Sequence, residues 1–168
     1  PFVSDEPMIG EMRLQWWRDA LEEIRTGAAR RAHEVVQPLA EVARATALPV
    51  DVLDRLAAAH RVHVERAGFE DAGHLDEFLE TTGGGLMWAS AAALGAGAEL
   101  EARVRARGWA AGLAGYLRAI PALEARGRRP LPDGRPEAVR ALATQGLAKL
   151  RAAQGPVPAA VRPALLAG

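Results

Sequence analysis

The sequence contains no cysteine, and this absence removes several kinds of site. Without a thiol, the chain of 168 residues has no disulfide scaffold, no cysteine nucleophile and no thiolate metal ligand. Aromatic residues are scarce as well, at 5% of the chain, whereas hydrophobic residues make up 49% and are mostly alanine and leucine. Because alanine and leucine favour helices and aromatic or β-branched residues favour strands, the composition predicts an all-α fold.

An excess of charge of either sign is also lacking, since 21 Lys and Arg residues balance 21 Asp and Glu residues. A protein that binds nucleic acid through a strong overall field carries excess positive charge, so we expect no nucleic-acid partner. No uninterrupted apolar run reaches the ~18 residues of a transmembrane helix, and no signal peptide is visible. We therefore expect a cytoplasmic protein whose contact with the inner membrane is at most peripheral.

Apolar residues recur at helical spacing along the chain, and its length fits a single domain over residues 1–168. Glycines and prolines divide the pattern, which predicts no strand and the following helices: 9–24, 33–47, 51–67, 75–94, 100–125 and 137–153. The triplet Gly83–Gly85 should interrupt the fourth helix, because each glycine costs a helix about 1 kcal/mol relative to alanine. The tail from about residue 154 is expected to be partly frayed.

Three groups of polar residues could carry chemistry, and each has a plainer structural explanation. His60 and His63 lie one helical turn apart and could hold a metal, but no third ligand is obvious nearby. Asp19, Glu22 and Glu23 share one helix face, where they could chelate Mg²⁺ or simply pair with neighbouring arginines. A Gly/Pro-rich loop carries guanidinium groups that suit phosphate or simply face solvent: Arg126, Arg128, Arg129 and Arg135. We predict no metal site and no catalytic residue from these groups.

The segment EPMIGEMRLQWWRDALEEI, residues 6–24, resembles an early segment of the squalene/phytoene synthase family, specifically of a divergent bacterial branch. It is also similar to the mitochondrial complex I assembly factor of that family. Two later segments agree in order and spacing. HLDEFLETTGGGLMWASAAALG resembles the family helix with a threonine before a small-residue break, and GLAGYLRAIPALEARGRRPLP resembles the second aspartate-rich motif and its Gly-Arg-x-Tyr-Leu-Pro ending.

The resemblance implies an isoprenoid synthase-like bundle of helices around an apolar cavity. Active members condense two prenyl diphosphates head to head, with two aspartate-rich motifs holding Mg²⁺ on the diphosphates, because the departing charge must be neutralised. In this chain the acidic positions of the second motif fall at Ala119, Ala122 and Leu123, and Glu124 is the only acid near them.

The first aspartate-rich motif should lie upstream of the double-tryptophan segment that begins at Glu11, where only Asp5 and Glu6 precede it. We therefore expect the bundle to lack its N-terminal helices. Two functions remain open. We favour a protein that is not a competent prenyl transferase, needs no cofactor and acts in isoprenoid binding or assembly. The alternative is an active prenyl-diphosphate transferase that uses Mg²⁺ and whose first motif lies in the missing N-terminus.

The resemblance also implies where a ligand would bind, if a ligand role survives. A prenyl diphosphate or isoprenoid lipid would be contacted by Arg13, Trp17, Thr82, Tyr116, Arg118, Arg126 and Arg128. Its chain would enter an apolar cavity, the alternative being a filled core, lined by Leu86, Trp88, Trp109, Leu113 and Tyr116. A helical bundle without its first helices would show its core face to water, so we also expect a homo-oligomer.

Overall fold

The computed structural model describes residues 6–28, 31–65 and 68–166, and helices are the only regular elements within these ranges. The α-helices are α1 (Pro7–Arg25), α2 (Val36–Ala45), α3 (Val50–Ala59), α4 (Arg61–Glu65), α5 (Ala72–Leu79), α6 (Gly85–Ala93), α7 (Glu101–Glu124) and α8 (Pro136–Ala152). A π-helical turn η1 (Glu80–Gly84) joins α5 to α6, and two 3₁₀ segments complete the set, η2 (Ala98–Leu100) and η3 (Ala159–Leu166). The prediction of an all-α fold is confirmed.

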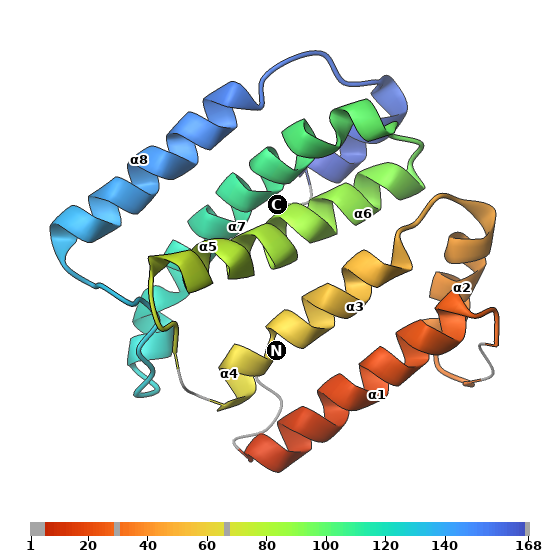
Figure 1. Cartoon of the computed structure of the whole chain (residues 1–168), viewed down its shortest axis with the longest axis horizontal. Coiled ribbons are helices and arrows are strands. Elements are labelled where there is room, and N and C mark those ends of the chain that lie inside the picture. Colours follow the sequence, from red (N-terminus) through yellow and green to blue (C-terminus); the bar gives the residue numbers. More distant parts are fainter. Residues whose placement is uncertain (1–5, 29–30, 66–67, 167–168) are drawn as a thin grey trace.

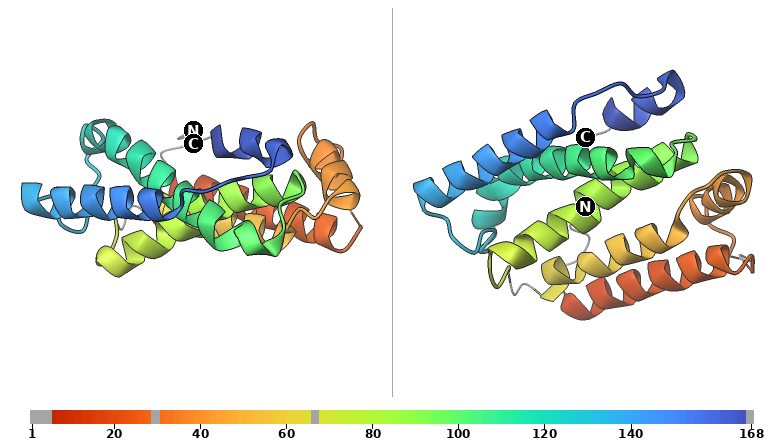
Figure 2. Two further views of the ribbon diagram at one scale, coloured as in Figure 1. Left: turned by 90° about the horizontal axis from the view of Figure 1, so that it is seen from above. Right: turned by 45° about the horizontal axis from the view of Figure 1, so that its top comes forward.

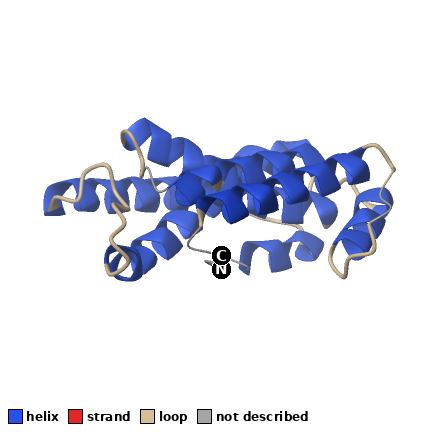
Figure 3. Ribbon diagram, turned by 90° about the horizontal axis from the view of Figure 1, so that it is seen from below, coloured by secondary structure: helices blue, strands red, loops and turns tan. Residues whose placement is uncertain are grey.

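The long helices lie side by side in the order α1, α3, α5–α6, α7, α8 (Figure 1). Seen from above and from below, they form a flattened slab rather than a rounded bundle (Figures 2 and 3). Helices α1 and α8 therefore form the two edges of the layer, and each of them packs against the inner helices on one side.

The buried residues fall into three clusters along this layer. One lies between α1 and α2 and is built on Ala20, Ile24, Val36 and Ala40. A second joins α3, α6, the start of α7 and η3, and includes Val52, Trp88, Val104 and Val161. The third joins α5 and the second half of α7 and includes Leu75, Leu79, Trp109 and Leu113.

The glycine triplet marks the closest approach between two helices. A Cβ atom added to Gly83 would lie 2.5 Å from the carbonyl oxygen of Gly108 and 3.1 Å from the Cα of Gly112, so α7 crosses η1 backbone to backbone. The triplet was predicted to interrupt the helix, and the helical conformation does change there but does not end. The chain continues through the triplet as a π-helical turn, with a Cβ-free surface that lets α7 approach.

Two predicted helices differ from those observed. The helix expected over 51–67 is divided into α3 and α4 at His60, whose Nδ1 lies 2.8 Å from the carbonyl oxygen of Leu56 and whose amide bonds to Ala57 instead. The His60 side chain thus occupies the Leu56 carbonyl that its own amide would bind in a regular α-helix, and the chain makes a tighter turn between α3 and α4. Residue 67 lies outside the described residues. Helix α2 is shorter than the predicted 33–47, with Pro38 in its first turn, where a proline leaves no helical bond unmade.

The C-terminal segment, expected to be partly frayed from about residue 154, forms the 3₁₀ segment η3 over residues 159–166. Val161 is fully buried and Ala164 is 4% exposed, and both belong to the cluster around α6 and α7. Two prolines, Pro158 and Pro163, keep the segment from forming a longer α-helix. Apolar burial, rather than helical hydrogen bonding, thus holds the tail against the layer.

Candidate functional site

The two adjacent tryptophans form the corner between α1 and α2. Trp16 and Trp17 meet edge to face at 5.0 Å, and the ring of His33 lies 4.9 Å from Trp16 and 5.5 Å from Trp17. The guanidinium of Arg31 sits 5.2 Å from the Trp16 ring, a cation–π distance. Both rings also pack on the cluster between α1 and α2. The pair is therefore explained by packing at the edge of the layer.

The carboxylates of α1 pair with arginines. Glu22 accepts two bonds from Arg25, at 2.7 and 2.6 Å, and Glu23 accepts one from Arg31 at 2.9 Å. Asp19 lies 3.9 Å from the same Arg31. No group of three or more potential metal-ligating side chains occurs in the described part of the chain. The plainer explanation of this acidic group, pairing with neighbouring arginines, describes these contacts.

Five rings gather between α3, α4, α5 and the second half of α7, and we call them the aromatic cluster: His60, His63, Phe69, Phe78 and Tyr116. Phe78 lies 5.1 Å from His63 and 5.2 Å from Phe69, and Tyr116 stacks on His63 at 6.3 Å. The cavity beside the cluster measures about 20 Å³, room for about one water molecule.

Two hydrogen bonds join the aromatic cluster to the loop after α7. The Tyr116 hydroxyl donates to the carbonyl of Pro130 at 2.8 Å, and Arg128 Nη1 donates to the carbonyl of His63 at 2.9 Å. Burial lowers the pKa of His63 to about 4, aided by the charges of His60 and Arg128, and burial raises the pKa of Tyr116 to about 12. At neutral pH His63 and Tyr116 are therefore uncharged, and the cluster closes the loop onto α7.

The positions aligned with the second aspartate motif lie at this end of α7. Leu123 is 6% exposed and lines the small cavity together with Tyr116 and Arg128, whereas Ala122 is exposed and Ala119 is half-buried. A carboxylate at position 123 would be buried beside aromatic rings and Arg128, in a cavity with room for about one water molecule. Leu123 is therefore part of the packing at this end of α7.

The seven predicted ligand contacts do not converge. Tyr116 and Arg128 line the same small cavity. Thr82 lies in η1, and its hydroxyl donates to the carbonyl of Phe78 at 2.7 Å. The remaining four lie apart from the cavity, on the edge helix α1 or exposed near the end of α7: Arg13, Trp17, Arg118 and Arg126. A role for any of them in ligand binding stays a prediction.

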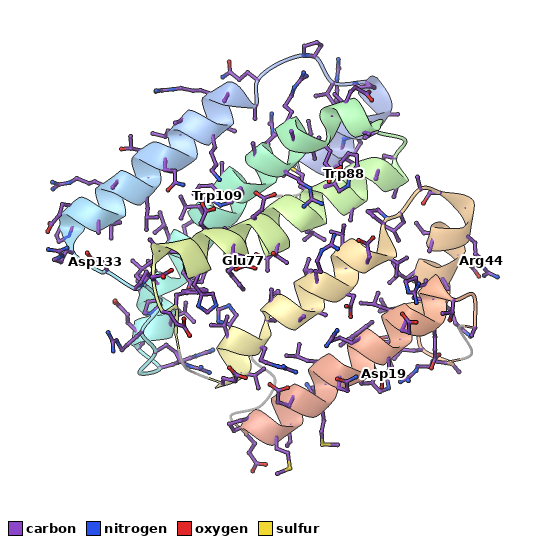
Figure 4. All side chains as sticks on the ribbon, viewed as in Figure 1. Asp19, Arg44, Glu77, Trp88, Trp109 and Asp133 are labelled. Carbon is purple, nitrogen blue, oxygen red and sulfur yellow. The ribbon has the colours of Figure 1, made fainter. Side chains whose placement is uncertain are left out.

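The residues predicted to line an apolar cavity pack instead in separate places. Trp109 is fully buried in the cluster with Leu113, Trp88 belongs to the cluster with η3, and Leu86 is 50% exposed. Figure 4 shows Trp88 and Trp109 at different points along α6 and α7. Trp88, Trp109 and Leu113 are therefore packed in the core, whereas Leu86 is not.

The sequence did not indicate the aromatic cluster as a unit. Phe69 follows Gly68, which adopts a positive φ of +77°, so the chain turns there and carries the ring back over α4. The i, i+3 spacing of His60 and His63 was the one available signal, since it places both rings on one face. Their neighbours on α5 and α7 could not be recognised before the helices were packed.

Comparison with known families agrees with this fold. No helix in the described ranges combines the length and the apolar character needed to cross a membrane. Neither the curated proteins nor the solved structures with which the chain was compared include a significant match. A family model described as squalene/phytoene synthase matches residues 3–165, which is most of the chain. The chain therefore belongs to the squalene/phytoene synthase family and has its all-α, isoprenoid synthase-like fold.

Proposed function

We propose that this protein is a non-catalytic member of the squalene/phytoene synthase family that acts in isoprenoid binding or assembly. The observation that carries the proposal is the end of α7. None of the three positions aligned with the acidic residues of the second motif carries a carboxylate, and Leu123 is buried beside a cavity of about 20 Å³. A diphosphate with its metal ions needs carboxylates and more room than one water molecule.

A second function, prenyl-diphosphate transfer with Mg²⁺, is favoured by the family membership itself. It would require the first aspartate motif to supply the metal ligands without the second. Among the candidates for that motif in this sequence, Asp5 lies outside the described residues and Glu6 is the residue before α1.

The two functions are separated by one assay. The protein is incubated with farnesyl or geranylgeranyl diphosphate, Mg²⁺ and NADPH, and the extract is analysed for squalene and phytoene. A competent enzyme of the family serves as the positive control. We expect no product from this protein, and turnover comparable to that of the control enzyme would refute the proposal.

An assembly role is supported by the amount of surface that the chain exposes. Its accessible surface is 10050 Å², whereas a compact monomer of 17.8 kDa exposes ~8,000 Å². Large apolar side chains lie exposed at both edges of the layer, among them Met8 and Met12 on α1, and Leu147 and Leu150 on α8. The difference, ~2,000 Å² on one chain, exceeds the ~800 Å² that each partner contributes to a standard protein–protein interface. We propose that a second copy of the chain covers one of these edges, in the cytoplasm or at the surface of the inner membrane.

The oligomer is tested by sedimentation velocity over a range of concentrations. We expect a dimer that dissociates in either Met8→Glu/Met12→Glu or Leu147→Glu/Leu150→Glu, and the sensitive pair identifies the edge. The other pair is the matched control, because both replace two exposed apolar side chains with two carboxylates. A monodisperse monomer at high concentration would contradict the proposed self-association.

A further inference from the structure

A pocket of about 370 Å³ lies at the opposite end of α7 from the aromatic cluster. Its polar side chains are Arg107, from the first half of α7, and Arg162, from η3. Its apolar wall is formed by Val157, Leu165 and Leu166. This volume lies within the range of pockets that hold small ligands.

The arginines of this pocket have no acidic partner. Within the described residues neither Arg107 nor Arg162 forms an ion pair, and the nearby Glu101 is bound by Arg105 at 2.7 Å. The sequence from 138 to 168 contains no Asp or Glu but four basic residues: Arg140, Lys149, Arg151 and Arg162. Of these four, Lys149 pairs with Asp76 at 3.5 Å, whereas Arg162 in the pocket forms no ion pair within the described residues.

The pocket wall is held in place by its own hydrogen bond. Arg103, one helical turn before Arg107, donates from Nη1 to the carbonyl of Pro156 at 2.9 Å and so fixes the turn that precedes η3. Val161 and Ala164 anchor η3 in the core, while Leu166 on the same segment is 81% exposed. The segment thus presents an exposed leucine beside guanidinium groups. Such a surface can contact both the apolar chain and the anionic head of an amphiphile.

We propose that this pocket binds the phosphate end of an apolar-chain lipid. Arg107 and Arg162 would bind the phosphate oxygens through charge-assisted hydrogen bonds, for which guanidinium groups are well shaped. Leu165 and Leu166 would contact the first carbons of the chain. The inference does not depend on whether the protein catalyses condensation, because it uses none of the residues aligned with the aspartate motifs.

The test is binding of the full chain to two probes that carry the same chemistry. The first is vesicles of phosphatidylcholine with and without phosphatidylglycerol, measured by co-sedimentation. The second is decyl phosphate below its micelle concentration, measured by calorimetry, with inorganic phosphate for comparison. Binding to phosphatidylglycerol vesicles alone identifies a membrane headgroup as the source, whereas saturable binding of decyl phosphate identifies a free amphiphile. Either result supports the proposal, and binding of neither probe overturns it.

Variants assign the binding to the pocket. In Arg107→Ala/Arg162→Ala the affinity should fall at least about tenfold, since each basic side chain near an anionic surface contributes about 1 kcal/mol. The matched control is Arg44→Ala/Arg140→Ala, which removes two exposed arginines outside the pocket and should lose less than about threefold. Equal losses in the two double variants would overturn the assignment.

A single variant tests the leucine wall of the pocket without lowering the stability of the protein. Leu166→Ser replaces a largely exposed side chain, so circular dichroism and the unfolding midpoint should not change. Its affinity for decyl phosphate should fall about threefold or more, while its weak affinity for inorganic phosphate stays the same. Unchanged decyl phosphate affinity in this variant would contradict a role for the leucine wall.

Discussion

The two ends of α7 differ in packing: side chains fill the space around the C-terminal end, whereas a pocket lies beside the first half. At the C-terminal end, Leu123 and Tyr116 close against the aromatic cluster and leave a cavity of about 20 Å³. In the first half, Arg107 faces an open pocket of about 370 Å³ lined by the C-terminal segment. The polar groups at the closed end bond to backbone carbonyls, whereas the arginines of the open pocket have no acidic partner in the described part of the chain.

The end of α7 that resembles the family motif and the end that carries the open, arginine-lined pocket are therefore different parts of the molecule. The closed end carries the residues aligned with the second aspartate motif, yet Leu123 belongs to the packing there. The open pocket is built from residues that none of the recognised motifs contains.

The largest effect is expected from returning an acid to the closed end. Leu123→Asp would remove a buried side chain and place a carboxylate among aromatic rings, at a cost of about 4 kcal/mol in the free energy of unfolding. Ala122→Asp is the matched control, because position 122 is exposed and should tolerate the same acid within about 0.5 kcal/mol. Urea denaturation measures both. Equal stability of the two variants would show that the closed end is not packed as described.

A second variant tests the crossing that holds α7 between its two ends. Gly83→Val would push a side chain into the backbone of Gly108 and should lower the free energy of unfolding by about 3 kcal/mol. Gly134 has open space around it, so Gly134→Val should be close to neutral. Thermal denaturation followed by circular dichroism checks the pair. A neutral Gly83→Val would mean that the two helices do not need their close contact.

The pH dependence of stability reports on the closed end. The folded-state pKa of His63 is lowered to about 4 from an ordinary 6.5, so between these values the unfolded chain binds more protons than the folded one. The contribution of His63 to stability is therefore complete above about pH 6.5 and is lost as the pH falls toward 4, by on the order of 3 kcal/mol.

His63→Phe should remove this contribution, since the phenylalanine ring keeps the aromatic contact but cannot be protonated. His74→Gln, which leaves His63 in place, should retain it. Urea midpoints at pH 7, 6, 5 and 4 for the three proteins provide the measurement. A slope that is the same in His63→Phe as in the parent chain would assign the pH dependence to other groups.

The smallest effect is expected from the bond that ties the loop to α7. Tyr116→Phe removes the hydroxyl that donates to Pro130 and should cost about 1 kcal/mol. Hydrogen exchange should show faster opening of the loop after α7, with the pocket around Arg107 unaffected. If hydrogen exchange also became faster in residues 155–166, the stability of the two ends of α7 would be coupled, and they would not be independent as described here.

Much of the helical layout follows from local sequence. The segments around α1, α7 and α8 were predicted within a few residues, because their apolar spacing is regular and glycine or proline stands at or near their ends. The π-helical turn and the joint at His60 were not foreseen. Both arise from contacts with other groups, the α7 backbone in one case and the Leu56 carbonyl in the other.

The sequence by itself determined the helical class, the family and the absence of acids at positions 119, 122 and 123, because these depend on composition, spacing and residue identity. Only the tertiary structure decided which residues share a site. Trp88 and Trp109, predicted to line one cavity, lie in different core clusters. Arg107 and Arg162, far apart in the sequence, line one pocket because η3 packs back against the layer. Helical spacing in the sequence tells on which face of its own helix a residue lies. Which other helix packs against that face depends on how apolar surface is buried between helices in the tertiary structure.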